Sequence, residues 1–310
     1  MITRQEFPYL QELLIHDACV AKHLRVPVFE PGQEFRHLVL TGRSGAGKTT
    51  VLRDLAANEA MRFPYPNARP ALRRQVEARF YGRSQQHSLE VILRSRFVFA
   101  FFEATRQLRV QEVTSVVRAD ALEAELSHPE NTQLKTALFK QFLVNKKVFH
   151  VFDALDGKTE SARQKESFFR QLDATLAQLF EDPGARLEFV RENFEFYLHL
   201  SDGRRLTLNE LSAGYSALLS VFMELLMRVD LLRTQVSDYG YDPCGFVLID
   251  EPEAHLHPEM QRQLLPLLAG LFPNLQFIVA THSPAVAFSL PNTTVFDLST
   301  GQALPAPPAA

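Results

Sequence analysis

The sequence predicts an α/β protein in which a mostly parallel β-sheet is flanked by helices and interrupted by an inserted helical subdomain. Three observations lead to this fold class. Apolar segments of strand length alternate with helical segments along the chain. A glycine-rich loop joins one of these strands to the helix that follows it. A long stretch, residues 107–181, has a helical pattern and a single glycine, Gly157.

The individual elements follow from hydrophobic periodicity and from turn residues. Strands are predicted at 19–29, 35–40, 96–104, 187–200, 245–250, 276–280 and 295–298. Helices are predicted at 49–60, 215–233 and 258–271. The proline-containing residues 61–82 are expected to be irregular. The predicted organisation is the N-terminal part of a core, a helical insertion, the C-terminal part of the core and a disordered tail, at residues 1–106, 107–186, 187–300 and 301–310.

Composition and charge narrow the class of protein. The chain has 310 residues, of which 46% are hydrophobic and 22% charged, as in a globular protein with a sizeable core. Its net charge of −3 provides no basic field for nucleic acid or acidic membranes. Two cysteines, Cys19 and Cys244, make neither a disulfide framework nor a metal cluster. Without a secretory signal or an apolar run of about 18 residues, we expect a cytoplasmic protein that does not contact membranes.

The strongest motif is a P-loop, which fits the pattern G-x-x-x-x-G-K-[ST]. It consists of Gly42, Arg43, Ser44, Gly45, Ala46, Gly47, Lys48 and Thr49, and Thr50 follows it. The N–H groups of such a loop and the helix N-terminus behind it bind phosphate oxygens. We expect Lys48 to contact the β- and γ-phosphates of a nucleotide and the Thr49 hydroxyl to ligate Mg²⁺.

A second motif is an apolar strand that ends in two carboxylates, Asp250 and Glu251. In open α/β sheets, ligands bind beyond the carboxyl ends of the strands. We therefore expect Asp250 to hold Mg²⁺ through water and Glu251 to activate the attacking water as a general base. The alternative, a solvated acidic turn after a core strand, is disfavoured by the P-loop earlier in the chain.

Two further motifs concern a helix start and a histidine. Ser212 can cap the helix that begins after it, and Gly214 allows close backbone approach, so together they predict an anion-binding helix N-terminus. His282 follows the strand at 276–280, 32 residues after Asp250. This spacing accommodates one helix and the neighbouring parallel strand, so His282 is expected on the γ-phosphate side of the site. A structural histidine is the alternative.

The order of these motifs resembles that of the ABC-type ATPase domain. Within that class, LIDEPEAHLHP at 248–258 and VATHSP at 279–284 are similar to the SMC-like and OLD-like ATPases. The chain also resembles small AAA-family ATPases that serve as ATPase subunits of bacterial anti-phage systems of the Septu and retron type. The resemblance implies ATP and Mg²⁺ as ligands, with Lys48, Glu251 and His282 as catalytic residues. It also implies an ATP-sandwiched homodimer in which Ser212 and Gly214 contact ATP bound to the opposite protomer.

The function that this resemblance implies is an ATPase acting as a nucleotide-gated switch for a separate effector protein, such as a nuclease. Two alternatives stay open. One is an SMC-like ATPase of DNA repair that binds nucleic acid directly, and the other is the nucleotide-binding subunit of a transporter. The HLHP sequence after the acidic strand end and the helical insertion disfavour the transporter. Gln107 is a candidate for the glutamine-bearing loop of such ATPases, and an ordinary surface glutamine after a strand is the alternative.

Three weaker patterns have ordinary explanations as well as functional ones. Glu253, His255 and His257 have the composition of a zinc site, but the same spelling recurs in the resembling family without that role. A local excess of arginines could follow a phosphate backbone, although a solvated or partner-facing surface is favoured: Arg69, Arg73, Arg74, Arg79, Arg83, Arg94 and Arg96. Six phenylalanines of the insertion are expected to form a small core: Phe139, Phe142, Phe149, Phe152, Phe168 and Phe169.

Overall fold

The structure, a computed structural model, describes residues 2–57, 75–81, 97–127 and 135–305. The chain divides into two compact units. The first unit combines Met1–Arg106 with Leu232–Ala310, and the second is Gln107–Leu231. The first unit is thus built from two stretches that are far apart in the sequence.

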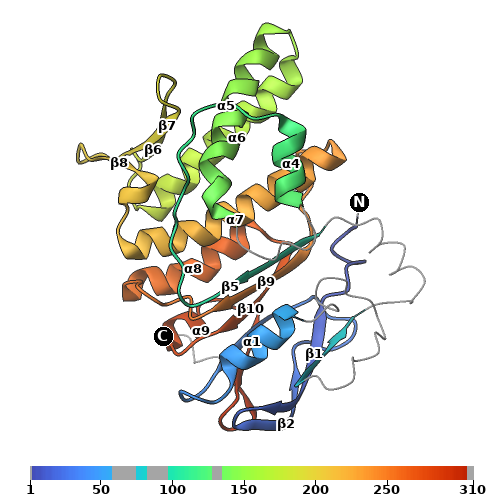
Figure 1. Ribbon diagram of the computed structural model, residues 1–310. Coiled ribbons are helices and arrows are strands. Elements are labelled where there is room, and N and C mark those ends of the chain that lie inside the picture. Colours follow the sequence, from blue (N-terminus) through green and yellow to red (C-terminus); the bar gives the residue numbers. More distant parts are fainter. Residues whose placement is uncertain (1, 58–74, 82–96, 128–134, 306–310) are drawn as a thin grey trace. The chain divides into compact units, whose positions relative to one another are not determined.

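A six-stranded sheet with the order β12-β11-β3-β10-β9-β5 forms the centre of the first unit (Figure 1). Its strands are β3 (His37–Thr41), β5 (Val98–Phe102), β9 (Gly245–Asp250), β10 (Leu275–Ala280), β11 (Thr293–Asp297) and β12 (Gln302–Leu304). Pairing is parallel from β11 to β5, and β12 joins β11 in the antiparallel sense. All residues of β9 and β10 are buried, as expected for apolar strands that are covered on both faces of a parallel sheet.

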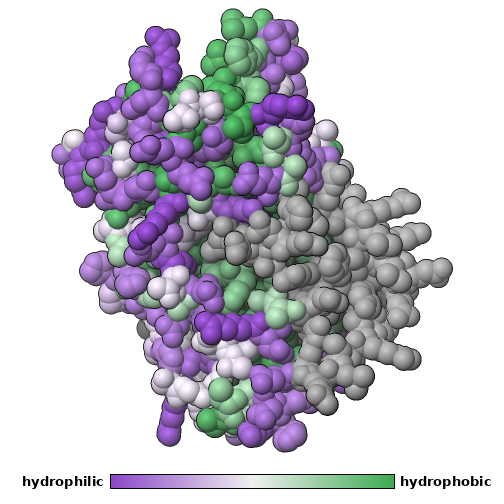
Figure 2. Space-filling model, in the orientation of Figure 1, coloured by the Kyte–Doolittle hydropathy of each residue, from purple (hydrophilic) through white to green (hydrophobic). Residues whose placement is uncertain are grey.

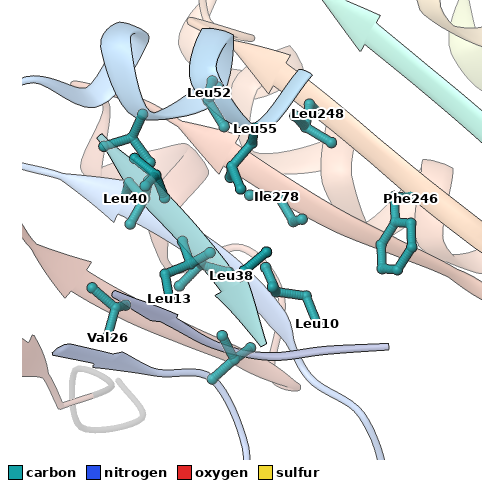
Figure 3. Close-up of a cluster of buried hydrophobic side chains, with 14 of the residues drawn as sticks. Leu10, Leu13, Val26, Leu38, Leu40, Leu52, Leu55, Phe246, Leu248 and Ile278 are labelled. Atoms are coloured by element: carbon teal, nitrogen blue, oxygen red, sulfur yellow. The ribbon is translucent and has the colours of Figure 1, made fainter. Parts of the chain in front are cut away.

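A second, antiparallel sheet of the same unit has the order β2-β1-β4. Its strands are β1 (Leu10–Ala18), β2 (Ala21–Pro27) and β4 (Val76–Phe80). Helix α1 (Lys48–Ala57) contacts β1 and β4 as well as β9 and β10, so it lies between the two sheets. Figure 3 shows leucines of α1 and β3 meeting apolar side chains of β1, β9 and β10 in this core. This packing fixes the start of α1 beside the carboxyl ends of the parallel strands.

Two helices follow the central strands β9 and β10. Helix α8 (Pro258–Leu271) connects the two strands, and it buries Leu264, Leu265 and Leu268. The short helix α9 (Pro284–Ala287) follows β10, and the Ser283 hydroxyl accepts a hydrogen bond from the N–H of Val286 at its start. Both helices begin with a proline, which supplies a suitable φ and lacks only an N–H that needs no partner in the helix.

The second unit combines helices with a small antiparallel sheet of order β6-β7-β8. Its helices are α4 (Ala119–Ser127), the 3₁₀ turns η1 (Thr136–Leu138) and η2 (Leu208–Glu210), α5 (Phe139–Leu155), α6 (Thr159–Leu179) and α7 (Ala213–Val236), whose last residues belong to the first unit. Its strands are β6 (Arg186–Val190), β7 (Glu195–His199) and β8 (Arg205–Thr207). The unit includes α4, α5 and α6 of the predicted helical insertion and extends beyond residue 186 to Leu231.

Several predicted elements are confirmed with small shifts in their bounds, and those of β9 and α8 are confirmed without any. Strand β1 was missed, because a register shift between Leu10 and Glu12 disturbs the alternation that marks a strand. Strand β4 lies where an irregular segment is predicted, because its pairing with β1 is purely tertiary. The strand predicted at 187–200 is the hairpin of β6 and β7, whose turn contains no glycine or proline.

Two further expectations need correction. The tail predicted to be disordered begins with β12, which pairs with β11 in register Val295 to Leu304, whereas residues 306–310 lie outside the described residues. Phe139, Phe142 and Phe168 are buried as expected, but Phe152 is 53% exposed. Its neighbours Val151 and Leu155 are exposed as well. These three residues occupy the last turns of α5, at the tip of its hairpin with α6, where Figure 2 shows apolar surface.

Candidate functional site

The glycine-rich loop lies between β3 and α1, at the carboxyl end of the parallel sheet. Gly42 has a φ of +131°, and a Cβ there would lie 2.7 Å from Oγ of Ser299 and 2.9 Å from Oδ1 of Asp297. The N–H of Arg43 donates to the same Ser299 hydroxyl over 2.8 Å. The turn after β11 therefore holds the first residues of the loop, and only glycine fits at its entry.

The far end of the loop backs onto the β1–β2 hairpin. Gly47 has a φ of +102°, and a Cβ at this position would lie 2.2 Å from the carbonyl oxygen of Ala18. One residue into the hairpin turn, Cys19 places its Sγ 3.6 Å from Oγ1 of Thr50. The predicted phosphate-binding residues between these ends, Ser44, Gly45 and Ala46, form the remainder of the loop, and the N–H of Ala46 donates to the carbonyl of Arg43.

Lys48 is buried at the first turn of α1, inside the curve of the loop. Its Nζ donates to the carbonyl oxygens of Gly42 (2.9 Å) and Arg43 (3.2 Å), and it lies 3.5 Å from Nδ1 of His282. Burial lowers the pKa of Lys48, and nearby carboxylates, above all Glu251, act in the opposite direction. The predicted phosphate-binding lysine and the predicted histidine are thus neighbours.

Thr49 and Asp250 also come together, as the sequence predicts. The hydroxyl of Thr49 donates to Oδ1 of Asp250 over 3.2 Å, which joins the start of α1 to the end of β9. Burial raises the pKa of Asp250, and the Thr49 hydrogen bond partly offsets this effect. A hydroxyl and a carboxylate side by side are the oxygen ligands that Mg²⁺ prefers, and a magnesium site on protein needs few of them. The two residues therefore fit Mg²⁺.

Glu251 occupies the first position after β9 in a left-handed conformation, with a φ of +45°. Its N–H donates to the carbonyl of Ala280 over 2.8 Å, and its own carbonyl accepts from the N–H of Ala254 over 3.0 Å. A non-glycine residue in this region carries backbone strain that the surrounding structure must hold, and such strain clusters at functional sites. The Glu251 side chain therefore does not point in the direction that the regular alternation of strand β9 would give it.

Glu253 has a role that the sequence did not reveal. Its carboxylate accepts hydrogen bonds from the Thr281 hydroxyl (2.6 Å), the His282 N–H (2.6 Å) and the Ser283 N–H (3.2 Å). This carboxylate, which the sequence groups with His255 and His257 as a possible zinc site, holds the loop that carries His282. Among the residues that the structure describes, no group of three or more His, Cys, Asp or Glu side chains could hold a metal ion.

Arg106 is a second residue that the sequence analysis did not single out. It is 6% exposed, and its guanidinium donates to the carbonyl oxygens of Asp250, Glu251 and Pro252. Its neighbour Gln107, the candidate for a glutamine-bearing loop, is exposed and belongs to the second unit. A basic residue two positions after the strand predicted at 96–104 is the one sequence signal that could have drawn attention to Arg106, whose burial is seen only in the structure.

Ser212 and Gly214 stand at the N-terminus of α7 in the second unit, as predicted. The carbonyl of Ser212 accepts the first hydrogen bond of the helix, from the N–H of Ser216. Tyr215 stacks on Phe180, with 4.3 Å between the ring centroids, and thereby anchors the helix start. The contact of these two residues with a nucleotide stays a prediction, since it concerns another protomer.

The predicted arginine-rich surface is described in part. Arg79 on β4 donates to the carboxylates of Glu12 (2.9 Å) and Glu77 (3.2 Å), so its charge is neutralised within the first unit. The other six arginines of the cluster lie outside the described residues. Among the described residues, none of the helices is long and apolar enough to span a membrane.

A phosphate-binding loop between a strand and a helix, facing an acidic strand end, defines this chain as an α/β protein of the P-loop NTPase class. Residues 84–288 match the family described as "AAA domain, putative AbiEii toxin, Type IV TA system". This match covers more than half of the chain, and the chain belongs to that family. The matched region contains Ser212, Asp250, Glu251 and His282 and begins after the P-loop.

A retron ATPase and a Septu protein are among the relatives of the chain. The chain is 38% identical over 102 residues to the Retron Ec83 probable ATPase of Escherichia coli, and this alignment covers 33% of this chain and 19% of that protein. It is 28% identical over 153 residues to the Septu protein PtuA of Bacillus thuringiensis, which covers 47% of this chain and 35% of that protein. The chain spans well under half the length of these relatives. A solved Smc head bound to the C-winged helix domain of ScpA is 14% identical, with a TM-score of 0.47 over 94% of each chain.

Proposed function

We propose that this chain binds ATP with Mg²⁺, hydrolyses it to ADP and phosphate in a homodimer, and uses the cycle to gate a separate effector protein in cytoplasmic anti-phage defence. The observation that supports it best is the convergence of four motif residues in the first unit. Lys48 contacts His282, and Thr49 contacts Asp250, although the two members of each pair are more than 200 residues apart. The relatives in retron and Septu systems support the defence role.

The residues of the first unit have distinct roles in this proposal. Lys48 would neutralise phosphate charge, and its present partners, the carbonyls of Gly42 and Arg43, hold its ammonium within the loop. Thr49 and Asp250 would hold Mg²⁺, which would offset charge on the phosphates. ATP supplies the phosphoanhydride bond that is broken. The protein's task is then to orient water and to stabilise the charge that develops on the γ-phosphate.

Glu251 is the group best suited to take a proton from the attacking water. It follows Asp250 directly, and its left-handed backbone conformation sends its side chain in a direction different from that of a continuing strand. His282, beside Lys48, is proposed to stabilise the γ-phosphate side of the site. Glu253 binds the main-chain N–H of His282 and so fixes the position from which the histidine side chain extends.

A homodimer is proposed because Lys48 and its loop would surround one nucleotide, while the start of α7 would offer a second anion site. The Ser212 hydroxyl, the following N–H groups and the positive end of a 24-residue helix would stabilise phosphate charge from the opposite protomer. A two-fold axis then creates two equal sites from one interface. The effector would sense the difference between the ATP-bound dimer and the released chains.

Hydrolysis by the purified chain, together with its mass in solution, tests this proposal. Glu251→Gln should bind ATP, hydrolyse it about 10²- to 10⁴-fold more slowly, and accumulate as a dimer by light scattering. Ser212→Arg in the same background should prevent the mass shift, whereas Ser115→Arg, at another exposed serine of the second unit, should not. A chain that turns over ATP at full rate as a monomer at every concentration would refute the dimer, and absence of any turnover would refute the ATPase.

A further inference from the structure

Arg106 joins the segment after β5 to the turn after β9. Its Nη1 donates to the carbonyl of Asp250 over 3.0 Å and to that of Glu103 over 3.1 Å. Its Nη2 donates to the carbonyls of Glu251 (3.2 Å) and Pro252 (2.9 Å). One side chain therefore binds three consecutive carbonyl groups of the turn that carries the proposed magnesium ligand and general base.

The parallel sheet explains why Arg106 reaches this turn. Strands β5 and β9 are neighbours in parallel, with Phe102 opposite Ile249, so their carboxyl ends lie at the same edge. Arg106 stands four residues after β5 and extends across this edge. The guanidinium is a rigid planar fork with five donors, which can serve several carbonyls at once, whereas a lysine ammonium is a compact point charge.

The charge of Arg106 also suits this position. Burial lowers its pKa to about 10, and the carboxylates of Glu253, Asp250 and Glu251 act in the opposite direction. The guanidinium therefore remains protonated at neutral pH. The positive charge of Arg106 near the carboxylates of Asp250, Glu251 and Glu253 reduces the electrostatic repulsion among these three groups.

The turn itself needs external support. Glu251 is held with a φ of +45°, a conformation that non-glycine residues adopt only when their surroundings enforce it. The N–H of Glu251 donates to the carbonyl of Ala280, and the carbonyl of Glu251 accepts from the N–H of Ala254 and from the guanidinium of Arg106. Arg106 supplies the only side-chain cation that the described contacts place on this backbone segment.

We propose that Arg106 is a positioning residue for ATP hydrolysis: its guanidinium fixes the main chain of residues 250–252 and thereby the directions of the Asp250 and Glu251 carboxylates. This inference rests on the proposed ATPase function. It predicts an effect on kcat more than on ATP affinity, because phosphate binding depends mainly on the loop and Lys48. A structural role alone would lower stability and change turnover only in proportion to the folded fraction.

Arg106→Lys is the informative variant, since it retains the positive charge and loses the fork. We expect kcat to fall about 10- to 100-fold, the loss typical of a slightly misplaced reacting group, with ATP affinity and folded fraction unchanged. Arg109→Lys is the matched control, because Arg109 is exposed and bonds Gln107 at the surface. It should leave kcat at the wild-type value. A wild-type kcat in folded Arg106→Lys would overturn the inference.

A double-mutant cycle with Glu251→Gln tests whether Arg106 acts through Glu251. If it does, Arg106→Lys should have little further effect on the residual turnover of Glu251→Gln, because residues that act as a unit are not additive. Losses that multiply would show that Arg106 acts independently of the base and would contradict its role in positioning Glu251.

Amide hydrogen exchange of the nucleotide-free protein separates this inference from the proposed function. Arg106→Lys should speed exchange at the N–H groups of Glu251 and Ala254 and leave the core strand β10 unchanged. If wild-type protein shows no turnover, the ATPase proposal fails, and the positioning role for hydrolysis fails with it, whatever the exchange shows. If turnover is present but exchange at the turn is unaffected, only the role of Arg106 is refuted.

Discussion

The carboxylate of Glu253 accepts a hydrogen bond from the main-chain N–H of His282, with 2.6 Å between oxygen and nitrogen. Glu253 belongs to the turn after β9, and His282 follows β10, so this bond links the ends of two neighbouring parallel strands. The same carboxylate accepts from Thr281 and Ser283. The proposed base Glu251 and the proposed phosphate-side histidine are therefore held in one connected network.

Glu253→Gln should disrupt this network while retaining side-chain size. A glutamine offers one acceptor oxygen and presents an amide N–H₂ where donors already converge, so at least one of the three hydrogen bonds is lost. We expect turnover to fall about 10- to 100-fold with ATP affinity retained, measured by steady-state hydrolysis and equilibrium titration. Glu259→Gln, an exposed glutamate paired with Arg262 on α8, should have no such effect. Equal rates for both variants would contradict the role of Glu253.

Lys48→Ala should weaken ATP binding by about 10- to 100-fold, the value of one hydrogen bond to a charged group. The fold should persist, because the hydrogen bond from the N–H of Arg43 to the Ser299 hydroxyl still holds the loop entry after the lysine is removed. Fluorescent nucleotide titration measures the affinity, and circular dichroism measures the fold. Lys158→Ala, at an exposed lysine of the second unit, is the control. Unchanged ATP affinity in a folded Lys48→Ala variant would show that Lys48 of the P-loop does not bind the nucleotide.

Gly245→Ala should destabilise the central sheet. A Cβ at Gly245 would lie 2.1 Å from the carbonyl oxygen of Val98, its partner on β5, so the strands must separate. We expect a loss of about 1–3 kcal/mol in the free energy of unfolding, measured by urea denaturation. Gly270→Ala on α8 meets nothing within 4 Å and should be neutral or stabilise by up to about 1 kcal/mol. Similar stabilities of the two variants would argue against the β5–β9 pairing.

His37 should make the stability of the first unit depend on pH. Burial lowers its pKa to about 4, and its Nδ1 accepts a hydrogen bond from the N–H of Phe277 over 3.0 Å. In the unfolded chain the imidazole titrates near pH 6.5, so between pH 6.5 and 4 the unfolded state binds a proton that the folded state does not. Stability contributed by neutral His37 is therefore lost as the pH falls, by about 3 kcal/mol over this range.

Urea unfolding from pH 7 to pH 4.5 checks this prediction in wild-type protein and in His37→Asn. The asparagine can still accept from Phe277 but does not titrate. The variant should be less stable at pH 7, and the difference should narrow as the pH falls. Parallel stability profiles of the two proteins would show that His37 does not carry the pH dependence.

The motif residues were predictable because their spacing encodes local geometry. A strand, a glycine-rich loop and a helix place Lys48 and Thr49, and the carboxyl ends of parallel strands bring Asp250 and His282 to the same edge. Arg106 was not predictable in this way, because its partners are main-chain carbonyls 144, 145 and 146 residues away, and a carbonyl group has no sequence signature. The tertiary pairing of β4 with β1 escaped for the same reason.

The strand order of the central sheet has a consequence for how the chain folds during synthesis. The two strands from the N-terminal stretch, β3 and β5, are paired only with strands that follow residue 244, as far as the described residues show. The whole second unit therefore emerges from the ribosome before β3 has a neighbouring strand. The strands of the second unit pair with one another and need no strand from later in the chain. The loop entry also waits for Ser299, which binds Arg43. We expect nascent chains that stop before β10 to expose the apolar face of β3, and the phosphate-binding loop to be among the last parts of the molecule to form.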